Sequence, residues 1–280
     1  MKIEIDPGAG VCFGVEKAIE KAETLLGEGI ELFGLGHMVH NQTEISRLED
    51  LGLKTISRED LNDLKKGAIL IRAHGEPPES YRRAEANGNR IIDATCPIVL
   101  RLQKKIRDTY AQMDHQQEQI VLFGKADHPE TIGLLGQIKG DATVIGSVKD
   151  LDSVRTDRSV ILFSQTTMDP GEFDRVQAAL SERLSKKDTR LQSHCTICGQ
   201  MKRRKPALAE FAVKHDAILF VSGKNSANGR MLYEFCRSLN EHTYWISGNE
   251  ELQKEWFEGR DSIGISGATS TPFWQLESIK

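Results

Sequence analysis

Three cysteines stand where a thiol could ligate a metal. Cys12 follows the first apolar segment of the chain, and Cys96 and Cys198 also lie directly before a predicted helix. A thiol at a helix N-terminus is near the positive end of the helix dipole, which favours the thiolate that binds metal. The three residues are too far apart in the sequence to form a local zinc knuckle. Their spacing suits one thiol in each third of the fold.

Three thiolates that meet at one centre could hold an iron–sulfur cluster. Clusters that only carry electrons usually have four cysteine ligands, so a set of three leaves one iron open for catalysis. The alternative is that these cysteines are small buried hydrophobic residues. Cys195 and Cys198 also form a C-x-x-C pair, which is moderate evidence for thiol redox chemistry or for half a zinc site. Cys236 lies in an apolar helical pattern and is expected in the core.

The elements that must position these residues form an α/β pattern. Short runs rich in Val, Ile and Phe alternate with charged stretches of helical length, as in βα units around mainly parallel sheets. Polar residues follow the runs, at the strand ends where open α/β sheets bind ligands. The expected buried strands include 68–71, 119–123, 159–163, 217–221 and 262–265. The expected helices are 14–26, 42–51, 77–87, 97–113, 171–184, 202–215, 229–240 and 272–279.

Length and composition indicate an ordinary globular protein. The chain has 280 residues, of which 39% are hydrophobic, and its thirds contain similar numbers of expected elements. We therefore predict three small α/β domains with mainly parallel sheets, over residues 1–96, 97–193 and 194–280.

Charge and hydropathy exclude several classes of protein. The chain carries 37 basic and 41 acidic residues, a net charge of −4, which argues against a general nucleic-acid coat. The basic run Lys202–Lys205 is expected to be a solvated helix face, with nucleic-acid contact as the alternative. The sequence contains no apolar stretch of the roughly 18–20 residues that a membrane span needs. The charged N-terminus shows no secretory signal, and five cysteines do not suggest a disulfide framework, so the cytoplasm is the expected compartment.

Short motifs follow one another in a characteristic order along nearly the whole chain. They are Val11-Cys12-Phe13-Gly14-Val15, His40-Asn41, Ala73-His74-Gly75, Asp93-Ala94-Thr95-Cys96-Pro97, His128-Pro129-Glu130, Gln165-Thr166-Thr167, Thr196-Ile197-Cys198, Lys224-Asn225-Ser226-Ala227-Asn228 and Ala268-Thr269-Ser270-Thr271-Pro272. This series resembles the IspH (LytB) family, the 4-hydroxy-3-methylbut-2-enyl diphosphate reductases.

The resemblance implies an oxygen-sensitive [4Fe-4S] enzyme that catalyses the last step of the methylerythritol phosphate pathway of isoprenoid synthesis. Two electrons would remove the hydroxyl group of an allylic diphosphate alcohol as water, and the products would be isopentenyl diphosphate and dimethylallyl diphosphate. The family fold has three α/β domains around a central cluster. Cys12, Cys96 and Cys198 match the cluster ligands, and a small ferredoxin or flavodoxin is the expected electron donor.

The resemblance also implies roles for polar residues of the motifs. A diphosphate needs several donors in a confined pocket, and suitable side chains lie beside predicted helix N-termini. The expected diphosphate ligands are His40, His74, Ser226, Asn228 and Ser270. The resemblance places His128, Glu130 and Thr167 near the substrate hydroxyl. Glu130 is the expected proton source, acting directly or through Thr167 and the diphosphate.

Several residues depart from the usual family pattern. Ala227 replaces a serine and Asp127 replaces a glycine beside His128. The usual Arg-Gln segment after Cys198 becomes Arg204-Lys205-Pro206, and Cys195 is an additional thiol. Asn41 could cap the following helix instead of contacting a ligand.

Three other functions compete with the reductase. A thiol–disulfide oxidoreductase would use Cys195 and Cys198. An iron–sulfur regulatory or nucleic-acid-binding protein would use the cluster and the basic run Lys202–Lys205. A hydratase would use the same open iron without electron transfer.

Overall fold

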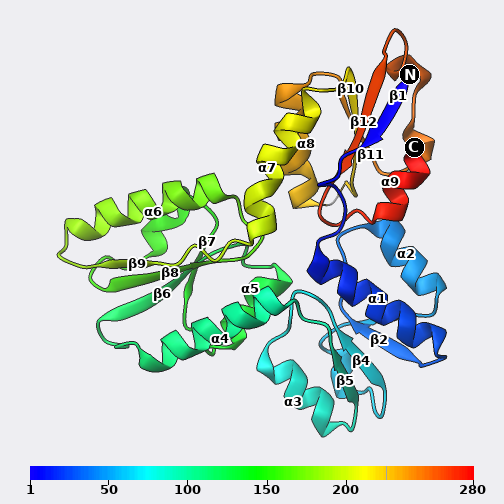
Figure 1. Cartoon of the computed structure of the whole chain (residues 1–280). Helices are drawn as coiled ribbons and strands as arrows, with labels where there is room; N and C mark the ends of the chain where they lie inside the picture. The colour runs from blue at the N-terminus through cyan, green and yellow to red at the C-terminus, as the bar shows by residue number, and fades with distance from the viewer. Residues whose placement is uncertain (225) are drawn as a thin grey trace. The chain divides into compact units, whose positions relative to one another are not determined.

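The computed structural model describes residues 1–224 and 226–280, so Asn225 of the Lys224–Asn228 motif lies outside the described residues. The described strands form three four-stranded sheets with the orders β1-β12-β10-β11, β3-β2-β4-β5 and β7-β6-β8-β9 (Figure 1). The strands are β1 (Lys2–Ile5), β2 (Leu32–Leu35), β3 (Lys54–Ile56), β4 (Ala68–Ile71), β5 (Arg90–Asp93), β6 (Glu118–Phe123), β7 (Thr143–Ile145), β8 (Ser159–Ser164), β9 (Leu191–Ser193), β10 (Ala217–Val221), β11 (Thr243–Ile246) and β12 (Ser262–Gly267).

Helices connect the strands in the alternating order that the sequence predicts. The α-helices are α1 (Phe13–Gly27), α2 (Gln42–Asp50), α3 (Pro78–Ala86), α4 (Pro97–Gln112), α5 (Pro129–Gly136), α6 (Pro170–Ser185), α7 (Gly199–Ala212), α8 (Ala227–Leu239) and α9 (Phe273–Ile279). Short 3-10 helices cover Asp60–Asn62, Val148–Ser153, Asn249–Glu251 and Lys254–Trp256. In the described part of the chain, no helix has the length and apolar character needed to cross a membrane.

The chain divides into two compact units. Unit 1 consists of Met1–Ile56 and Arg203–Lys280, and unit 2 consists of Ser57–Lys202. Strands β1, β10, β11 and β12 belong to unit 1 with β2 and β3, whereas β4 to β9 belong to unit 2.

The core of unit 1 has helices on both faces of β10. Ile218 and Phe220 pack against apolar residues of α7 and α8, which include the fully buried Cys236. Leu219 and Val221 pack on the opposite face, against α9. This alternation follows from the two-residue period of a strand. The burial of Cys236 confirms that it is a core residue.

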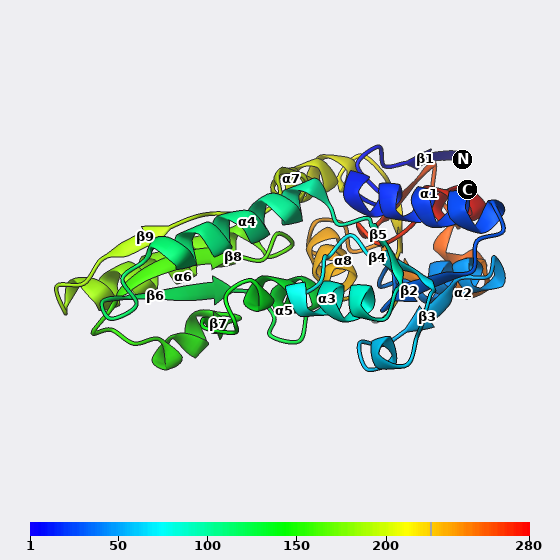
Figure 2. The ribbon, with the colours of Figure 1, turned by 90° about the horizontal axis from the view of Figure 1, so that it is seen from below.

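The core of unit 2 has the same three-layer construction. Ile120 and Leu122 of β6 pack against α4 and α5. On the other face, the ring of Phe123 lies 6.0 Å from that of Phe173 in α6. Figure 1 shows α6 on one side of this sheet and α4 with α5 on the other, and Figure 2 shows α4 running lengthwise along it. The structure therefore confirms the expected βα units with parallel strands.

Helix α5 is the α-helix that the sequence did not predict, and strands β2, β3, β7, β9 and β11 were not among the expected strands. The eight residues of α5 include Gly133 and Gly136, and glycine lowers helix propensity by about 1 kcal/mol relative to alanine. The structure explains Gly136, because a Cβ there would lie 2.5 Å from the Cβ of Pro77. Helix α7 begins earlier than expected, at Gly199.

Strand β1 pairs far from its neighbours in the sequence. Ile3 aligns with Ile263 of β12 in a parallel register. The N-terminal strand thus belongs to the sheet of the C-terminal third, which local patterns do not reveal. The domain ranges 1–96, 97–193 and 194–280 remain a prediction.

The basic run in α7 differs from its expected solvated face. Lys202 and Arg203 are exposed, but the side chain of Arg204 is only 2% exposed and forms an ion pair with the equally buried Asp6 at 2.7 Å. The expectation is therefore wrong for Arg204. A single buried cation within a charged run leaves no signal in composition alone, because its partner lies 198 residues away in the sequence.

Gly229 gives a test of how α8 is seated on β10. A Cβ at Gly229 would lie 1.9 Å from Oγ of Ser222. We expect Gly229→Ala to lower the free energy of unfolding in urea by about 1–3 kcal/mol through overpacking, although alanine favours helix. Gly27→Ala is the control, because no atom lies within 4 Å of its Cβ position. Equal effects of the two substitutions would contradict this packing.

Candidate active site

The carboxyl group of Glu130 lies in the first turn of α5, and its residue is only 1% exposed. His128 precedes the helix as its N-cap, and its Nδ1 accepts a hydrogen bond from the N–H of Glu130 at 3.1 Å. Pro129 occupies the first helical position, where its missing N–H costs nothing. The cap from His128 and the proline at the first helical position therefore start α5 shortly after β6, and this places His128 and Glu130 close together.

Thr166 holds the carboxylate of Glu130 at both oxygens. Its backbone N–H donates to Oε1 at 2.7 Å, and its hydroxyl donates to Oε2 at 2.7 Å. Burial raises the pKa of Glu130 from 4.5 to about 7, although the two bonds from Thr166 act in the opposite direction. A carboxyl group with this pKa can hold a proton near neutral pH and release it, as a general acid must.

The neighbouring Thr167 has a different partner. Its Oγ1 accepts a hydrogen bond from Nε2 of Gln165 at 2.7 Å. Oε1 of Gln165 in turn accepts from the N–H of Lys125 at 3.1 Å. Sequence reasoning thus missed the contact between Thr166 and Glu130, and the relay role of Thr167 remains a prediction. Both threonines lie in the turn after β8, outside the strand, so the alternation of a strand does not assign their sides.

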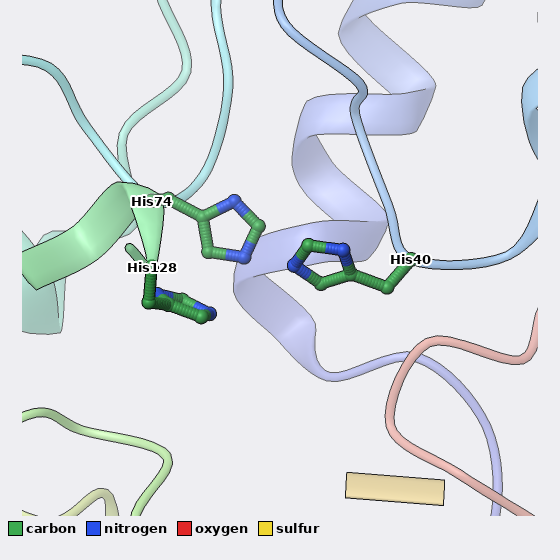
Figure 3. A group of neighbouring side chains, drawn as sticks. All are labelled: His40, His74 and His128. Atoms are coloured by element: carbon green, nitrogen blue, oxygen red, sulfur yellow. The ribbon is translucent and has the colours of Figure 1, made fainter. Parts of the chain in front are cut away.

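His74 and His128 lie together within unit 2. Their ring centroids are 5.2 Å apart and their planes meet at 87°, an edge-to-face arrangement (Figure 3). His74 is half-buried and follows β4. Figure 3 also labels His40, an exposed residue of unit 1 that precedes α2. Two of the expected histidines are therefore brought together by strand ends of one unit.

Gly75 explains the turn that carries His74. Its φ is +72°, a left-handed conformation that favours glycine. A Cβ at this position would lie 2.6 Å from Nε2 of Gln103 and 3.0 Å from Cγ2 of Thr95. Gln103 of α4 and Thr95, which precedes Cys96, therefore pack directly against the turn that carries His74.

Each candidate ligand cysteine lies at a helix N-terminus, as predicted. Cys12 is the N-cap of α1, Cys96 is the N-cap of α4, and Cys198 directly precedes α7. All three are half-buried. Within unit 2, the N–H of Cys96 donates to the carbonyl of Ala73 at 3.0 Å, and that of Cys198 donates to the carbonyl of Thr166 at 2.8 Å. Their thiols are partly accessible, and each lies at the positive end of a helix dipole. Such thiols are suited to bind a soft metal or an iron–sulfur cluster.

The C-x-x-C pair is not joined by a disulfide. Cys195 and Cys198 are both free thiols, and the first is exposed whereas the second is half-buried. The N–H of His194 donates to the carbonyl of Leu162, and the N–H of Cys198 donates to the carbonyl of Thr166, so the segment between them runs beside the end of β8.

The candidate diphosphate ligands of unit 1 lie at the ends of the paired strands β10 and β12. Ser226 caps α8 by accepting from the N–H of Gly229 at 3.0 Å, and its Oγ lies 3.5 Å from that of Ser270. Oδ1 of Asn228 accepts from the hydroxyl of Thr269 at 3.2 Å. Hydroxyl and amide groups beside a helix N-terminus are suited to bind phosphate oxygens.

Asn41 acts as a helix cap, as the alternative interpretation predicts. Its Oδ1 accepts from the N–H of Glu44 at 3.3 Å. Its Nδ2 donates to Oε1 of Gln275 at 2.8 Å, and both side chains are buried. Asn41 therefore fixes the segment that follows His40.

Comparison with known proteins identifies close relatives over the whole chain. The model of the family described as LytB protein matches residues 3–280. A Bacteroides fragilis protein named 4-hydroxy-3-methylbut-2-enyl diphosphate reductase is 46% identical over 279 residues, covering 100% of this chain and 96% of that protein. A protein of the same name from Bacteroides thetaiotaomicron is 45% identical over 279 residues, with the same coverage.

Solved structures match the fold as well. A structure titled as (E)-4-hydroxy-3-methyl-but-2-enyl diphosphate reductase, the terminal enzyme of the non-mevalonate pathway, has a TM-score of 0.75 and 33% identity. The match covers 100% of this chain and 98% of that one. A Plasmodium falciparum reductase structure has a TM-score of 0.83 at 24% identity, covering 99% of this chain and 86% of that one, and supports the fold.

The buried Glu130 predicts a pH-dependent stability. Because its pKa is raised in the folded state, the folded chain binds the proton more tightly, and stability falls as the pH rises from 4.5 to about 7. We expect Glu130→Gln to gain up to about 3 kcal/mol relative to the wild type between pH 5 and pH 8. Urea unfolding at both pH values measures this difference. Glu85→Gln, at an exposed position, is the control; a constant difference between wild type and Glu130→Gln would contradict the raised pKa.

Proposed function

This chain belongs to the LytB family, and we propose that it is a 4-hydroxy-3-methylbut-2-enyl diphosphate reductase. The reaction removes the hydroxyl group of an allylic diphosphate alcohol as water and gives isopentenyl diphosphate and dimethylallyl diphosphate, the last step of the methylerythritol phosphate pathway. It consumes two electrons and two protons. The observation that carries the proposal is the buried Glu130, whose pKa of about 7 suits a proton donor near neutral pH.

Cys12, Cys96 and Cys198 are the proposed ligands of a [4Fe-4S] cluster. Support comes from their shared position at helix N-termini, where thiolate is favoured. When bound, such a cluster supplies the electrons of the reduction and a Lewis acid. We propose a small ferredoxin or flavodoxin as the electron donor, and the cytoplasm as the compartment, where thiol ligands stay reduced.

The proposed diphosphate ligands are polar side chains of the sequence motifs. Ser226, Asn228 and Ser270 offer hydroxyl and amide donors at neighbouring strand ends of unit 1. His74 and His128 offer ring N–H donors in unit 2, and His40 is a further proposed ligand. Neutral or protonatable donors allow an anion to bind to a protein whose net charge is −4.

Glu130 is the proposed source of a proton for the substrate. Thr166 holds both carboxyl oxygens and so fixes the direction in which the proton can leave. His128 caps the same helix turn and is proposed to lie near the reacting hydroxyl with Thr167. Burial excludes water from the carboxyl, which reserves its proton for a bound substrate.

The competing functions have less support. A thiol–disulfide oxidoreductase would use Cys195 and Cys198 alone, and it would leave the helix-terminal Cys12 and Cys96 without a role. A nucleic-acid-binding role for Lys202–Lys205 loses Arg204, which is buried against Asp6. A hydratase would use the same site but would turn over without an electron donor.

The cysteine assignment predicts the behaviour of ligand variants. Cys12→Ser, Cys96→Ser and Cys198→Ser should each deplete or distort the cluster, because serine oxygen is a harder ligand than thiolate. The absorption and electron paramagnetic resonance spectra of anaerobically reconstituted protein measure this effect. Cys195→Ser is the matched control and should keep the wild-type spectra. Unchanged spectra in all three ligand variants would contradict the assignment of these cysteines as cluster ligands.

The proton assignment predicts how turnover depends on pH. Glu130→Gln should keep substrate binding and lose turnover by about 10²–10⁴-fold, the usual contribution of a general acid. Thr166→Val removes a hydrogen bond that lowers the pKa of Glu130, so the pH at which kcat falls should move upward. Thr167→Val should lower kcat without moving that pH. If Glu130→Gln turns over at the wild-type rate, another group supplies the proton.

A further inference from the structure

Arg204 and Asp6 form a buried ion pair that the proposed reaction does not use. Their side chains are 2% and 3% exposed, and Nη1 of Arg204 donates to Oδ2 of Asp6 at 2.7 Å. Removing one partner of such a pair leaves an uncompensated charge in the interior, which is strongly destabilising. Apolar residues could fill the same space, so the use of charge here points to a requirement for defined geometry.

Asp6 shapes the loop that leads to Cys12. Its Oδ1 accepts from the N–H of Gly8 at 2.8 Å, and its carbonyl accepts from the N–H of Ala9 at 2.9 Å. The guanidinium also lies against this loop, because a Cβ at Gly8 would be 3.2 Å from Nη1 of Arg204. The turn between β1 and α1 is therefore built around the Asp6 carboxylate.

The same guanidinium holds the end of β12. Nη2 of Arg204 donates to Oγ of Ser266 at 2.7 Å and to the carbonyl of Gly267 at 3.1 Å. Oγ of Ser266 donates to Oδ2 of Asp6 at 2.8 Å, which closes a ring of three hydrogen-bonded side chains. The loop that follows β12 leads to Ser270, one of the proposed diphosphate ligands.

The two loops also lie close to each other. Gly10 has a φ of +104°, and its Cβ position lies 3.8 Å from the carbonyl oxygen of Thr271. Cys12 follows Gly10 by two residues, and Ser270 precedes Thr271 directly. A shift of one loop would therefore displace the other loop as well.

We propose that Arg204 is a positioning residue, which holds the loop of Cys12 and the loop of Ser270 in one arrangement through Asp6 and Ser266. The inference rests on the proposed function for the roles of Cys12 and Ser270. The planar fork of arginine supplies the several donors in fixed directions that this arrangement needs. Lysine, with one ammonium group, cannot reproduce them together.

The first test uses the iron-free protein and needs no activity. We expect Arg204→Met and Asp6→Asn to raise the alkylation rate of Cys12 by iodoacetamide about tenfold, because the loop opens more often. Mass spectrometry resolves each cysteine, and the exposed Cys195 of unit 2 is the internal reference in the same sample. Ser266→Ala removes two hydrogen bonds and no charge, so it tests the same direction if the charged variants fail to fold.

The matched control is the pair formed by Glu4 and His215. Nε2 of His215 lies 2.9 Å from Oε2 of Glu4, so this pair also joins β1 to the C-terminal side of α7. Glu4 precedes Asp6 in the sequence, whereas Cys12 follows it. Glu4→Gln should leave the alkylation of Cys12 at the wild-type rate.

The second test uses reconstituted protein. Arg204→Met should change the electron paramagnetic resonance spectrum and weaken binding of inorganic diphosphate, and Arg204→Lys should restore neither. Wild-type alkylation and spectra in Arg204→Met, or the same changes in Glu4→Gln, would overturn the positioning role. A wild-type protein that never holds iron would refute the proposed function instead, and it would leave the alkylation test standing.

Discussion

The removal of the Glu130 carboxyl from water is the interaction on which the proposed chemistry depends. Its burial disfavours the charged form, and the two hydrogen bonds from Thr166 recover part of that cost. The result is a carboxyl group whose pKa lies near 7 and not near 4.5. This balance requires α5 to start at the end of β6, and it requires the turn after β8 to lie beside α5.

Parallel βα units satisfy that requirement by placing successive strand ends along one edge of a sheet. The turns after β6 and β8 carry Glu130 and Thr166, and those two strands pair directly. In unit 1, the paired strands β10 and β12 bring Ser226 near Ser270 in the same way. These two sheets thus repeat the same arrangement, in which polar side chains gather where strands end and helices begin. This explains how motifs that are far apart in the sequence come to lie at similar positions.

The sequence allowed the buried strands β4, β6, β8, β10 and β12, most helices and the helix-terminal positions of the cysteines to be predicted, because these depend on local periodicity and capping. It did not reveal α5, in which Gly136 is required by its contact with Pro77. It did not reveal the burial of Arg204, whose partner Asp6 lies at the other end of the chain. It also did not separate Thr166 from Thr167, since both lie in the turn after β8, where the alternation of a strand no longer fixes the side that each faces.

Anaerobic turnover tests the central claim most directly. A reduced one-electron donor and the allylic diphosphate alcohol are supplied together, donor oxidation is followed, and iron and sulfide are measured on the same sample. The account predicts donor oxidation with C5 diphosphate products and about four irons per chain. Turnover without any donor, or a protein that never holds iron, would contradict it.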